Sequence, residues 1–248
     1  MLAVLLQQFG DAAQGLALVE EALKWGTEID PELKSGGYIL AGWLAAQQED
    51  FIQARRYFEH GLAQAQALNH PVMAGRALAG LAMISVNEGK WHQAATKLAE
   101  AEGMLRPVGA WWDLALTLNI HSTLLQLQGD AASAVPLLRE SLLLSQDLGD
   151  RWAMVFSLEG LAGAAFTLGH LEKAVILFSA AQALREATGT LGYGSHSGRR
   201  LIEEQIETLR QQLGRTRWQE LTSQGQALSL AEMVSLALDR QDWSETAD

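Results

Sequence analysis

The sequence predicts an all-α fold, in which helical hairpins stack into a right-handed superhelix that ends in a C-terminal helical cap. The first observation is a repeat. Short polar breaks fall at steps of 39, 40, 40 and 40 residues, at Gly10, Glu49, Gly89, Gly129 and Gly169. A period in this range is typical of solenoids, whose units bury their apolar faces only against their neighbours. The second observation is composition, because 48% of the residues are apolar and only four are prolines. One continuous helical core is therefore expected.

The stretch that follows each break has small residues at fixed offsets and is predicted to be the second helix of a hairpin. The first small residue comes five positions after the break, at Gly15, Ala54, Ala94, Ala134 and Ala174. The next comes seven positions later, at Ala22, Gly61, Ala101, Ser141 and Ala181. Larger apolar residues lie between them, at Val19, Phe58, Leu98, Leu138 and Phe178. Spacings of three, four and seven put all of them on one helix face, where small residues allow close packing of a neighbouring helix.

A first helix of each hairpin is predicted before the break, over Gly36–Gln48, Val72–Glu88, Trp111–Gln128 and Trp152–Leu168. Each again has a small residue seven positions before the break, at Gly42, Ala82, Ser122 and Ala162. Directly after the breaks, Asp11, Asp50 and Asp130 can accept hydrogen bonds from free backbone N–H groups as N-caps. Pro31, Pro71 and Pro107 fall between hairpins, where a proline breaks no helical hydrogen bond.

The two ends of the chain differ. We expect five hairpin repeats over residues 1–188, the first incomplete, and a connecting loop with capping helices over 189–248. The cap is predicted as helices near Gly198–Leu213 and Arg217–Gln224 and a last helix opened by a Ser229–Glu232 capping box. At the other end, the apolar run Met1–Leu6 has no preceding layer to cover it. The chain is thus expected to be the C-terminal portion of a longer protein, or to pair these ends in a homodimer.

The repeat resembles the tetratricopeptide repeat (TPR) over about residues 1–188, in its late small residue, its Gly-Asp type of turn and its alanines seven apart. It departs from that family in having 39–40 residues per unit, where the usual length is about 34. The closing stretch, AVILFSAAQALREATG and then LIEEQIETLRQQLG, is similar to the end of bacterial ATP-dependent transcription activators of the MalT and LuxR kind. This resemblance implies a bacterial regulatory or signalling protein.

Composition and motifs exclude several kinds of chemistry. A net charge of −11 argues against nucleic-acid binding, and the C-terminal Arg199, Arg200, Arg210, Arg215 and Arg217 alternate with glutamates. No cysteine is present, and no two histidines have metal-ligand spacing. The glycine-rich Gly189–Gly198 stretch fits no phosphate-loop pattern. No apolar run spans a membrane and no signal peptide is seen, so we expect a cytoplasmic protein without cofactor, metal or catalytic residue.

A surface along the first helices remains as the candidate binding site. In a right-handed array these helices line the concave face, and equivalent positions give Trp43, Arg76, Met83, Asn87, Trp112, Asn119, Thr123, Trp152, Phe156, Glu159 and Phe166. Aromatic residues beside a few amide and charged groups suit recognition of a peptide or small polar molecule. Simple core packing is the alternative for Trp112 and Trp152. Asn119 and Glu159 are more informative, because they interrupt apolar helices.

These observations favour a non-enzymatic interaction or sensor module. We expect it to bind a protein segment, or a small-molecule effector, in the concave groove. Because each unit touches only its neighbours, small changes in curvature would add along the array and pass to adjoining domains. The alternative is a structural scaffold that dimerises through its uncovered N-terminal layer. An enzyme is the least favoured class, because Glu159 has no identifiable partner base.

Overall fold

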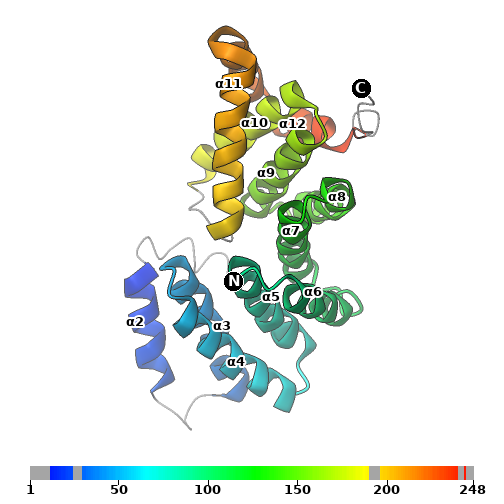
Figure 1. Cartoon of the computed structure of the whole chain (residues 1–248). Helices are drawn as coiled ribbons and strands as arrows, with labels where there is room; N and C mark the ends of the chain where they lie inside the picture. Colours follow the sequence, from blue (N-terminus) through cyan, green and yellow to red (C-terminus); the bar gives the residue numbers. More distant parts are fainter. Residues whose placement is uncertain (1–11, 25–29, 190–195, 240–242, 244–248) are drawn as a thin grey trace. The chain divides into compact units, whose positions relative to one another are not determined.

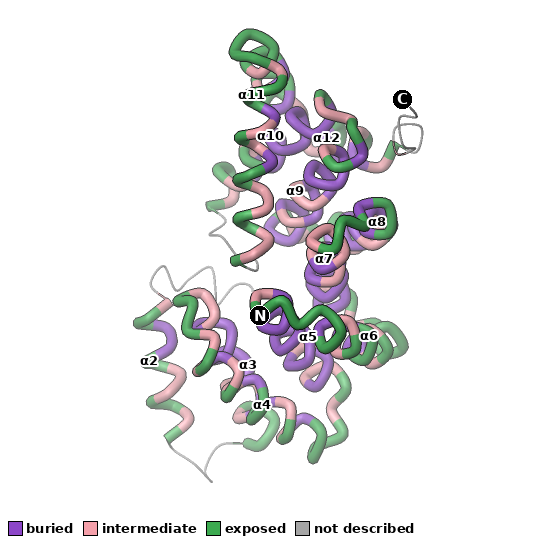
Figure 2. Tube along the Cα trace, viewed as in Figure 1, coloured by how far each residue is buried: buried purple, intermediate pink, exposed green. Residues whose placement is uncertain are grey.

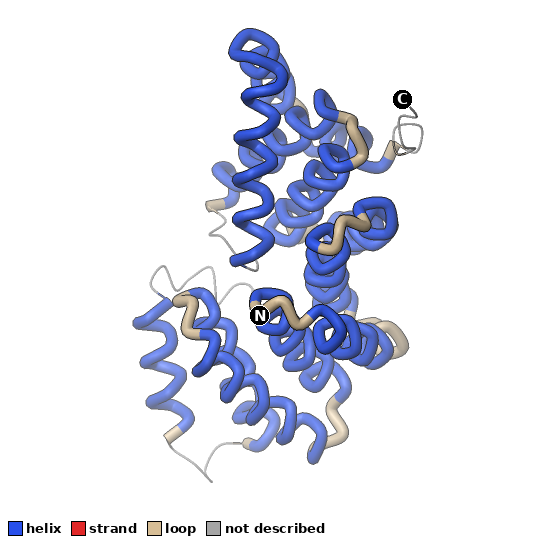
Figure 3. The backbone as a smooth tube through the Cα atoms, in the orientation of Figure 1, coloured by secondary structure: helices blue, strands red, loops and turns tan. Residues whose placement is uncertain are grey.

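The computed structural model describes residues 12–24, 30–189, 196–239 and 243, and within them every regular element is an α-helix (Figures 1 and 3). The helices are α2 (Ala12–Leu23), α3 (Pro31–Gln47), α4 (Phe51–Ala67), α5 (Pro71–Asn87), α6 (Trp91–Leu105), α7 (Trp111–Leu127), α8 (Ala131–Asp147), α9 (Arg151–Thr167), α10 (Leu171–Thr188), α11 (His196–Ala227) and α12 (Leu230–Leu238). The predicted all-α repeat of helical hairpins with C-terminal helices is confirmed. In the described part of the chain, no helix is long and apolar enough to cross a membrane.

The chain divides into two compact units, residues 1–117 and 118–248, with the boundary inside α7. The unit of residues 1–117 contains α2 to α6 and the start of α7. The unit of residues 118–248 contains the rest of α7 and the helices that follow. The packing of each unit is described separately below.

The turns repeat every 20 residues, because the predicted connections between hairpins have the same form as the breaks within them. A backbone φ between 51° and 87° occurs at Glu49, Asn69, Gly89, Gly109, Gly129, Gly149, Gly169 and Gly189. Each such residue follows a helix of 15 to 18 residues. At the first turn the N–H of Asp50 donates to the carbonyl of Ala45 over 3.1 Å, and at the fifth Asp130 donates to Leu125 over 2.9 Å. This is the Schellman pattern, which ends a helix with a left-handed residue. Two 20-residue helix-and-turn segments therefore make up each 40-residue unit.

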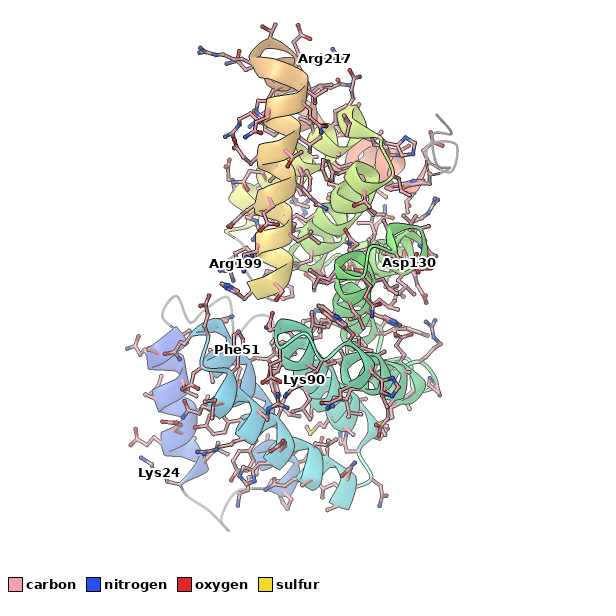
Figure 4. All side chains as sticks on the ribbon, viewed as in Figure 1. Lys24, Phe51, Lys90, Asp130, Arg199 and Arg217 are labelled. Carbon is pink, nitrogen blue, oxygen red and sulfur yellow. The ribbon has the colours of Figure 1, made fainter. Side chains whose placement is uncertain are left out.

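From Glu49 to Gly169, the next helix begins two residues after each left-handed position. Asp50 accepts a hydrogen bond from the N–H of Gln53 over 3.0 Å, and Asp130, labelled in Figure 4, accepts one from Ser133 over 3.0 Å. Two of the three predicted N-caps, Asp50 and Asp130, are thus confirmed, and Asp150 does the same for Ala153. The equivalent breaks at Gly10 and Asp11 lie outside the described residues. One turn therefore ends a helix and caps the next within three residues.

Phe58 is the centre of the core in the unit of residues 1–117. Its ring is fully buried and meets Trp43 edge-on, with the ring centroids 5.1 Å apart. Gly42 and Gly80 face the same ring, and a β-carbon on either would approach it to 2.7 or 2.4 Å. The glycines of α3 and α5 therefore let both helices close on the large residue of α4. Gly42 was among the predicted small residues, whereas on α5 Ala82 was predicted and Gly80 was not.

The core of the unit of residues 118–248 repeats this arrangement, with Leu138 of α8 against Gly160 of α9. Figure 2 shows α9 and α10 as largely buried helices. The capping helices complete this core, because Gly225 of α11 lies against the backbone of Ile176 and Leu221 is buried. Non-helical torsions at Gly214 divide α11 into two helical parts, as predicted, and the Ser229–Glu232 capping box opens α12.

The small residues predicted to pack are buried in four of the five repeats. Ala54, Ala94, Ala134 and Ala174 are completely buried, and so are Gly61 and its equivalents in the following units. The first repeat differs. Ala22 on α2 is exposed, although Gly15 on the same helix is buried. The face of α2 around Ala22 thus remains open in the described structure.

Candidate functional site

Three of the predicted site residues lie together in the unit of residues 118–248. Trp152, Phe156 and Glu159 stand on one face of α9, where spacings of four and three residues align them. The rings of Trp152 and Phe156 meet edge-on with centroids 4.8 Å apart. Arg185 of α10 completes the group, with its Nη2 atom 2.6 Å from Glu159 Oε1 and its guanidinium carbon 5.6 Å from the centre of the Phe156 ring. These four residues form the Arg185 cluster.

The ion pair in the Arg185 cluster is largely withdrawn from solvent. The side chains of Glu159 and Arg185 are 16% and 20% exposed. Burial raises the pKa of Glu159 above its ordinary value, because a desolvated carboxylate is less stable, and the charge of Arg185 opposes this effect only in part. Removing one partner of such a pair leaves a poorly solvated charge behind. The cluster is therefore a rigid polar point set among aromatic rings.

Arg76 makes a similar group in the unit of residues 1–117. Its Nε and Nη2 atoms donate to the two carboxylate oxygens of Asp113 over 2.6 and 2.9 Å. Its guanidinium carbon lies 5.9 Å from the ring centre of Trp112. The Arg76 side chain is 22% exposed, whereas that of Asp113 is only 7% exposed. Arg76, Trp112 and Asp113 form the Arg76 cluster, in which two residues were predicted as site residues.

Asn119 belongs to a buried hydrogen-bond network. Its Nδ2 atom donates to Ser141 Oγ over 2.9 Å, and its Oδ1 atom accepts from Ser157 Oγ over 3.3 Å. The two serine hydroxyls are 3.0 Å apart, and all three residues are at most 9% exposed. Thr123 donates to the backbone carbonyl of Asn119 over 3.0 Å. The polar group of Asn119 thus joins α7, α8 and α9 in the core, where it does not face solvent.

The predicted site residues can be divided into two groups by the burial of their side chains. Four side chains are in the core, at Trp43, Met83, Asn119 and Trp152, each at most 9% exposed. Partly exposed side chains occur at Arg76, Asn87, Trp112, Thr123, Phe156, Glu159 and Phe166. The core-packing alternative therefore describes Trp152, which is the buried member of the Arg185 cluster. In each unit, the partly exposed residues are the ones whose side chains reach solvent.

Two residues of these clusters were not predicted. Asp113 directly follows Trp112 and is the acidic residue in the first turn of α7, so its charge was a usable signal. Arg185 lies on the second helix of its hairpin, and only the fold brings it to Glu159. In the described residues, there is no group of three or more His, Cys, Asp or Glu side chains that could hold a metal ion. Two of the C-terminal arginines form the predicted local ion pairs, Arg200 with Glu204 over 3.4 Å and Arg210 with Glu207 over 3.5 Å. Arg217, labelled in Figure 4, instead pairs over 2.7 Å with Glu172 of α10.

Comparison with known proteins supports the fold. No protein-family model and no curated protein matches the chain. Among solved structures, the crystal structure of BtubC (BKLC) from P. vanneervenii is similar to it, with a TM-score of 0.57 and 21% sequence identity. The match covers 75% of this chain and 78% of that one. BtubC is a TPR-like helical repeat protein, and the chain described here has a TPR-like helical repeat fold.

Proposed function

We propose that this chain is a non-enzymatic, TPR-like interaction module of a cytoplasmic bacterial regulatory or signalling protein. It binds a protein segment, or a small effector, on the face presented by the first helices of the hairpins. The Arg185 cluster is the observation that carries this proposal. A charged pair that is mostly desolvated, with aromatic rings beside it, is the composition found at the energetic centres of protein interfaces.

The chemistry of the described residues fits binding better than catalysis. Glu159 is already ion-paired with Arg185, and Asp113 is already paired with Arg76 in two hydrogen bonds. Each carboxylate thus already accepts hydrogen bonds from an arginine, and we assign neither of them a role in proton transfer. The side chains instead fix the shape and charge of two surface points. The proposed role is recognition.

The regulatory setting rests on the resemblance of the closing segment to transcription activators of the MalT and LuxR kind. In that setting the proposed mechanism is mechanical. Each hairpin contacts only its neighbours, so a ligand that changes one interhelical angle shifts the hairpins beyond it. Left-handed residues every 20 positions give regular turns about which such changes can occur. Binding would then be transmitted to adjoining domains without a reaction.

A thermal-shift screen of the purified chain tests the proposal. Sugars, nucleotides, amino acids and short peptides serve as probes, because a ligand of the folded state raises the melting temperature by mass action. For each active probe, binding is measured again with Arg185→Gln. A loss of at least tenfold in affinity is expected if the Arg185 cluster is the contact point, since partners of desolvated charges contribute strongly.

Arg210→Gln is the matched control. Arg210 also lies over an aromatic ring, 5.2 Å from the centre of Trp218, and pairs with Glu207, but both charged side chains are more than half exposed. Its replacement should leave binding and stability nearly unchanged, because exposed ion pairs contribute little. If an active probe binds both variants with the same affinity, its binding site does not include the Arg185 cluster.

Self-association is the second candidate, and one observation favours it. Ala22 and Leu18 on α2 are exposed, Leu18 to 53%, whereas the equivalents of Ala22 in the later repeats are buried. An open packing face suits a second helix. The apolar run Met1–Leu6, on which the prediction was based, lies outside the described residues. Light scattering on Leu18→Glu tests this candidate: a dimer that becomes monomeric supports it, and an unchanged mass contradicts it.

A further inference from the structure

A carboxylate on α2 is held in place by two neutral donors of α4. Tyr57 donates its hydroxyl to Glu20 Oε1, and Gln53 Nε2 donates to the same oxygen over 3.1 Å. The Gln53 amide also contacts the Tyr57 hydroxyl at 3.2 Å. All three residues are partly buried. The geometry thus fixes the position of the Glu20 carboxylate without neutralising its charge.

Two further aromatic rings lie near the ring of Tyr57. The centroid of the Tyr38 ring on α3 is 6.4 Å from that of Tyr57 and 5.3 Å from that of His60, and the planes are tilted by 32° and 33°. His60 is exposed, and the two tyrosines are half-buried. Ring faces carry partial negative charge and attract cations placed over them. Glu20, Tyr38, Gln53, Tyr57 and His60 form the Glu20 patch.

The Glu20 patch lacks a positive charge of its own. No lysine, arginine or histidine of the described ranges forms an ion pair with Glu20. Burial, and then the hydrogen bond to Glu20, raise the pKa of Tyr57 to about 12, so its hydroxyl keeps its proton at neutral pH and continues to donate. The patch is therefore an anionic group held by hydrogen bonds, with aromatic rings nearby.

The same molecule shows which group fits such a site. In the Arg76 cluster a guanidinium lies over Trp112 and against Asp113, and in the Arg185 cluster another lies over Phe156 and against Glu159. Both combine an aromatic face with a carboxylate, and both are filled by an arginine of the chain. The Glu20 patch has the same two components with no arginine. Arginine suits them well, because its flat cation stacks on rings and donates to carboxylates.

We propose that the Glu20 patch receives an arginine side chain of a partner protein. This extends the proposed function, since it assumes that the chain binds proteins, and it assigns a second contact point with a defined chemistry. In the proposed complex the guanidinium lies against the rings of the patch and donates to the carboxylate of Glu20. The overall charge of −11 favours approach of a basic partner segment.

An NMR titration of the full chain tests this inference. The probes are N-acetylarginine amide and its neutral isostere N-acetylcitrulline amide, and the reporter is the side-chain amide signal of Gln53. The arginine probe should shift this signal in a saturable way that weakens with added salt, whereas the citrulline probe should not. Equal shifts with both probes would overturn the proposal. Tighter binding of tetramethylammonium than of the arginine probe would also overturn it, in favour of a quaternary ammonium ligand.

Four variants make the test specific. Glu20→Gln keeps the shape of the side chain and removes its charge, and Tyr38→Leu removes one ring. Each substitution should lower the affinity for the arginine probe by at least tenfold. Glu21→Gln is the control, because this exposed neighbour removes the same charge without touching the patch. Retained probe affinity in Glu20→Gln contradicts the proposal. Arg185→Gln should leave the titration with the arginine probe unchanged. The test of the Glu20 patch is therefore independent of the test of the Arg185 cluster, and either proposal can fail without the other.

Discussion

The ring of Phe58 lies against the backbone of Gly80, so closely that a β-carbon on Gly80 would stand 2.4 Å from ring atoms Cε1 and Cζ. No real side chain tolerates that distance. Because Phe58 is completely buried, its ring has no solvent side to move toward. The glycine thus sets how closely α5 can approach α4. The same ring also faces Gly42 of α3, so one large residue and two glycines determine the spacing of three helices.

Gly80→Ala should therefore destabilise the protein. Overpacking a filled core costs about 1–3 kcal/mol, which exceeds the gain of up to about 1 kcal/mol in helix propensity. Urea unfolding measures the change. Gly36→Ala is the control, because its new methyl group would meet only Met73 at 3.7 Å, an ordinary contact. Adding Phe58→Leu to Gly80→Ala should recover part of the loss, and strictly additive effects would contradict direct contact.

Gly129→Ala tests the left-handed turns. Gly129 has a φ of 83°, and a β-carbon there meets nothing within 4 Å, so the substitution probes backbone conformation alone. It should cost about 1–2 kcal/mol, because residues with a β-carbon disfavour this region. Gly103→Ala is the matched control: it also meets nothing within 4 Å, but it lies inside helix α6. There alanine should stabilise the protein by up to about 1 kcal/mol. If both substitutions changed the stability in the same direction, the left-handed backbone conformation of Gly129 would not be the cause.

The network around Asn119 should be sensitive to loss of one hydroxyl. Ser141→Ala removes the acceptor of Asn119 Nδ2 and leaves that buried donor without this bond, at a cost of about 1–3 kcal/mol. Ser145→Ala is the control on the same helix, because its hydroxyl donates only to the Ser141 carbonyl of its own helix, over 2.8 Å. Its cost should be under about 1 kcal/mol. Chemical unfolding of both variants measures the difference, and equal losses would mean that the network adds nothing beyond burial.

The sequence was sufficient for the repeat because its signals are local. The breaks at Glu49 and Gly129 and the small residues after them follow from spacing alone, and the structure has them in place. The connection before Pro71 was also predicted, but the left-handed residue that ends the preceding helix, Asn69, was not named. The regular 20-residue step between left-handed residues became visible only in the structure.

The candidate site was less predictable, because its contacts join different helices. Glu159 was recognised as a charge in an apolar helix, but its partner Arg185 is 26 residues away, and no local spacing connects them. Asn119 gave the same signal and has the opposite environment, in the core with Ser141 and Ser157. Periodicity identifies the inner face of a helix. Which neighbouring side chains satisfy a polar group there depends on the packing of other helices.

Glu159 should make stability depend on pH in the direction opposite to most carboxylates. Its folded pKa is raised above the ordinary 4.5 by burial, so the folded state binds its proton more tightly than the unfolded state does. Its contribution to stability is then highest below pH 4.5 and falls as pH rises through the raised folded pKa. The difference in unfolding free energy, wild type minus Glu159→Gln, should therefore decrease with increasing pH. Urea unfolding at a series of pH values from acid to neutral measures it.

Glu172→Gln supplies the control with the opposite sign. Two hydrogen bonds of 2.7 Å from Arg217 lower the pKa of Glu172, so this carboxylate stabilises the folded state once it is ionised. The difference in unfolding free energy, wild type minus Glu172→Gln, should increase as pH rises. It should disappear as pH falls through the lowered pKa of Glu172. Opposite slopes for the two pairs would show that burial dominates at Glu159 and hydrogen bonding at Glu172. A rising difference for Glu159 would mean that Arg185 outweighs desolvation, and the Arg185 cluster would then be a stabilising ion pair of the ordinary kind.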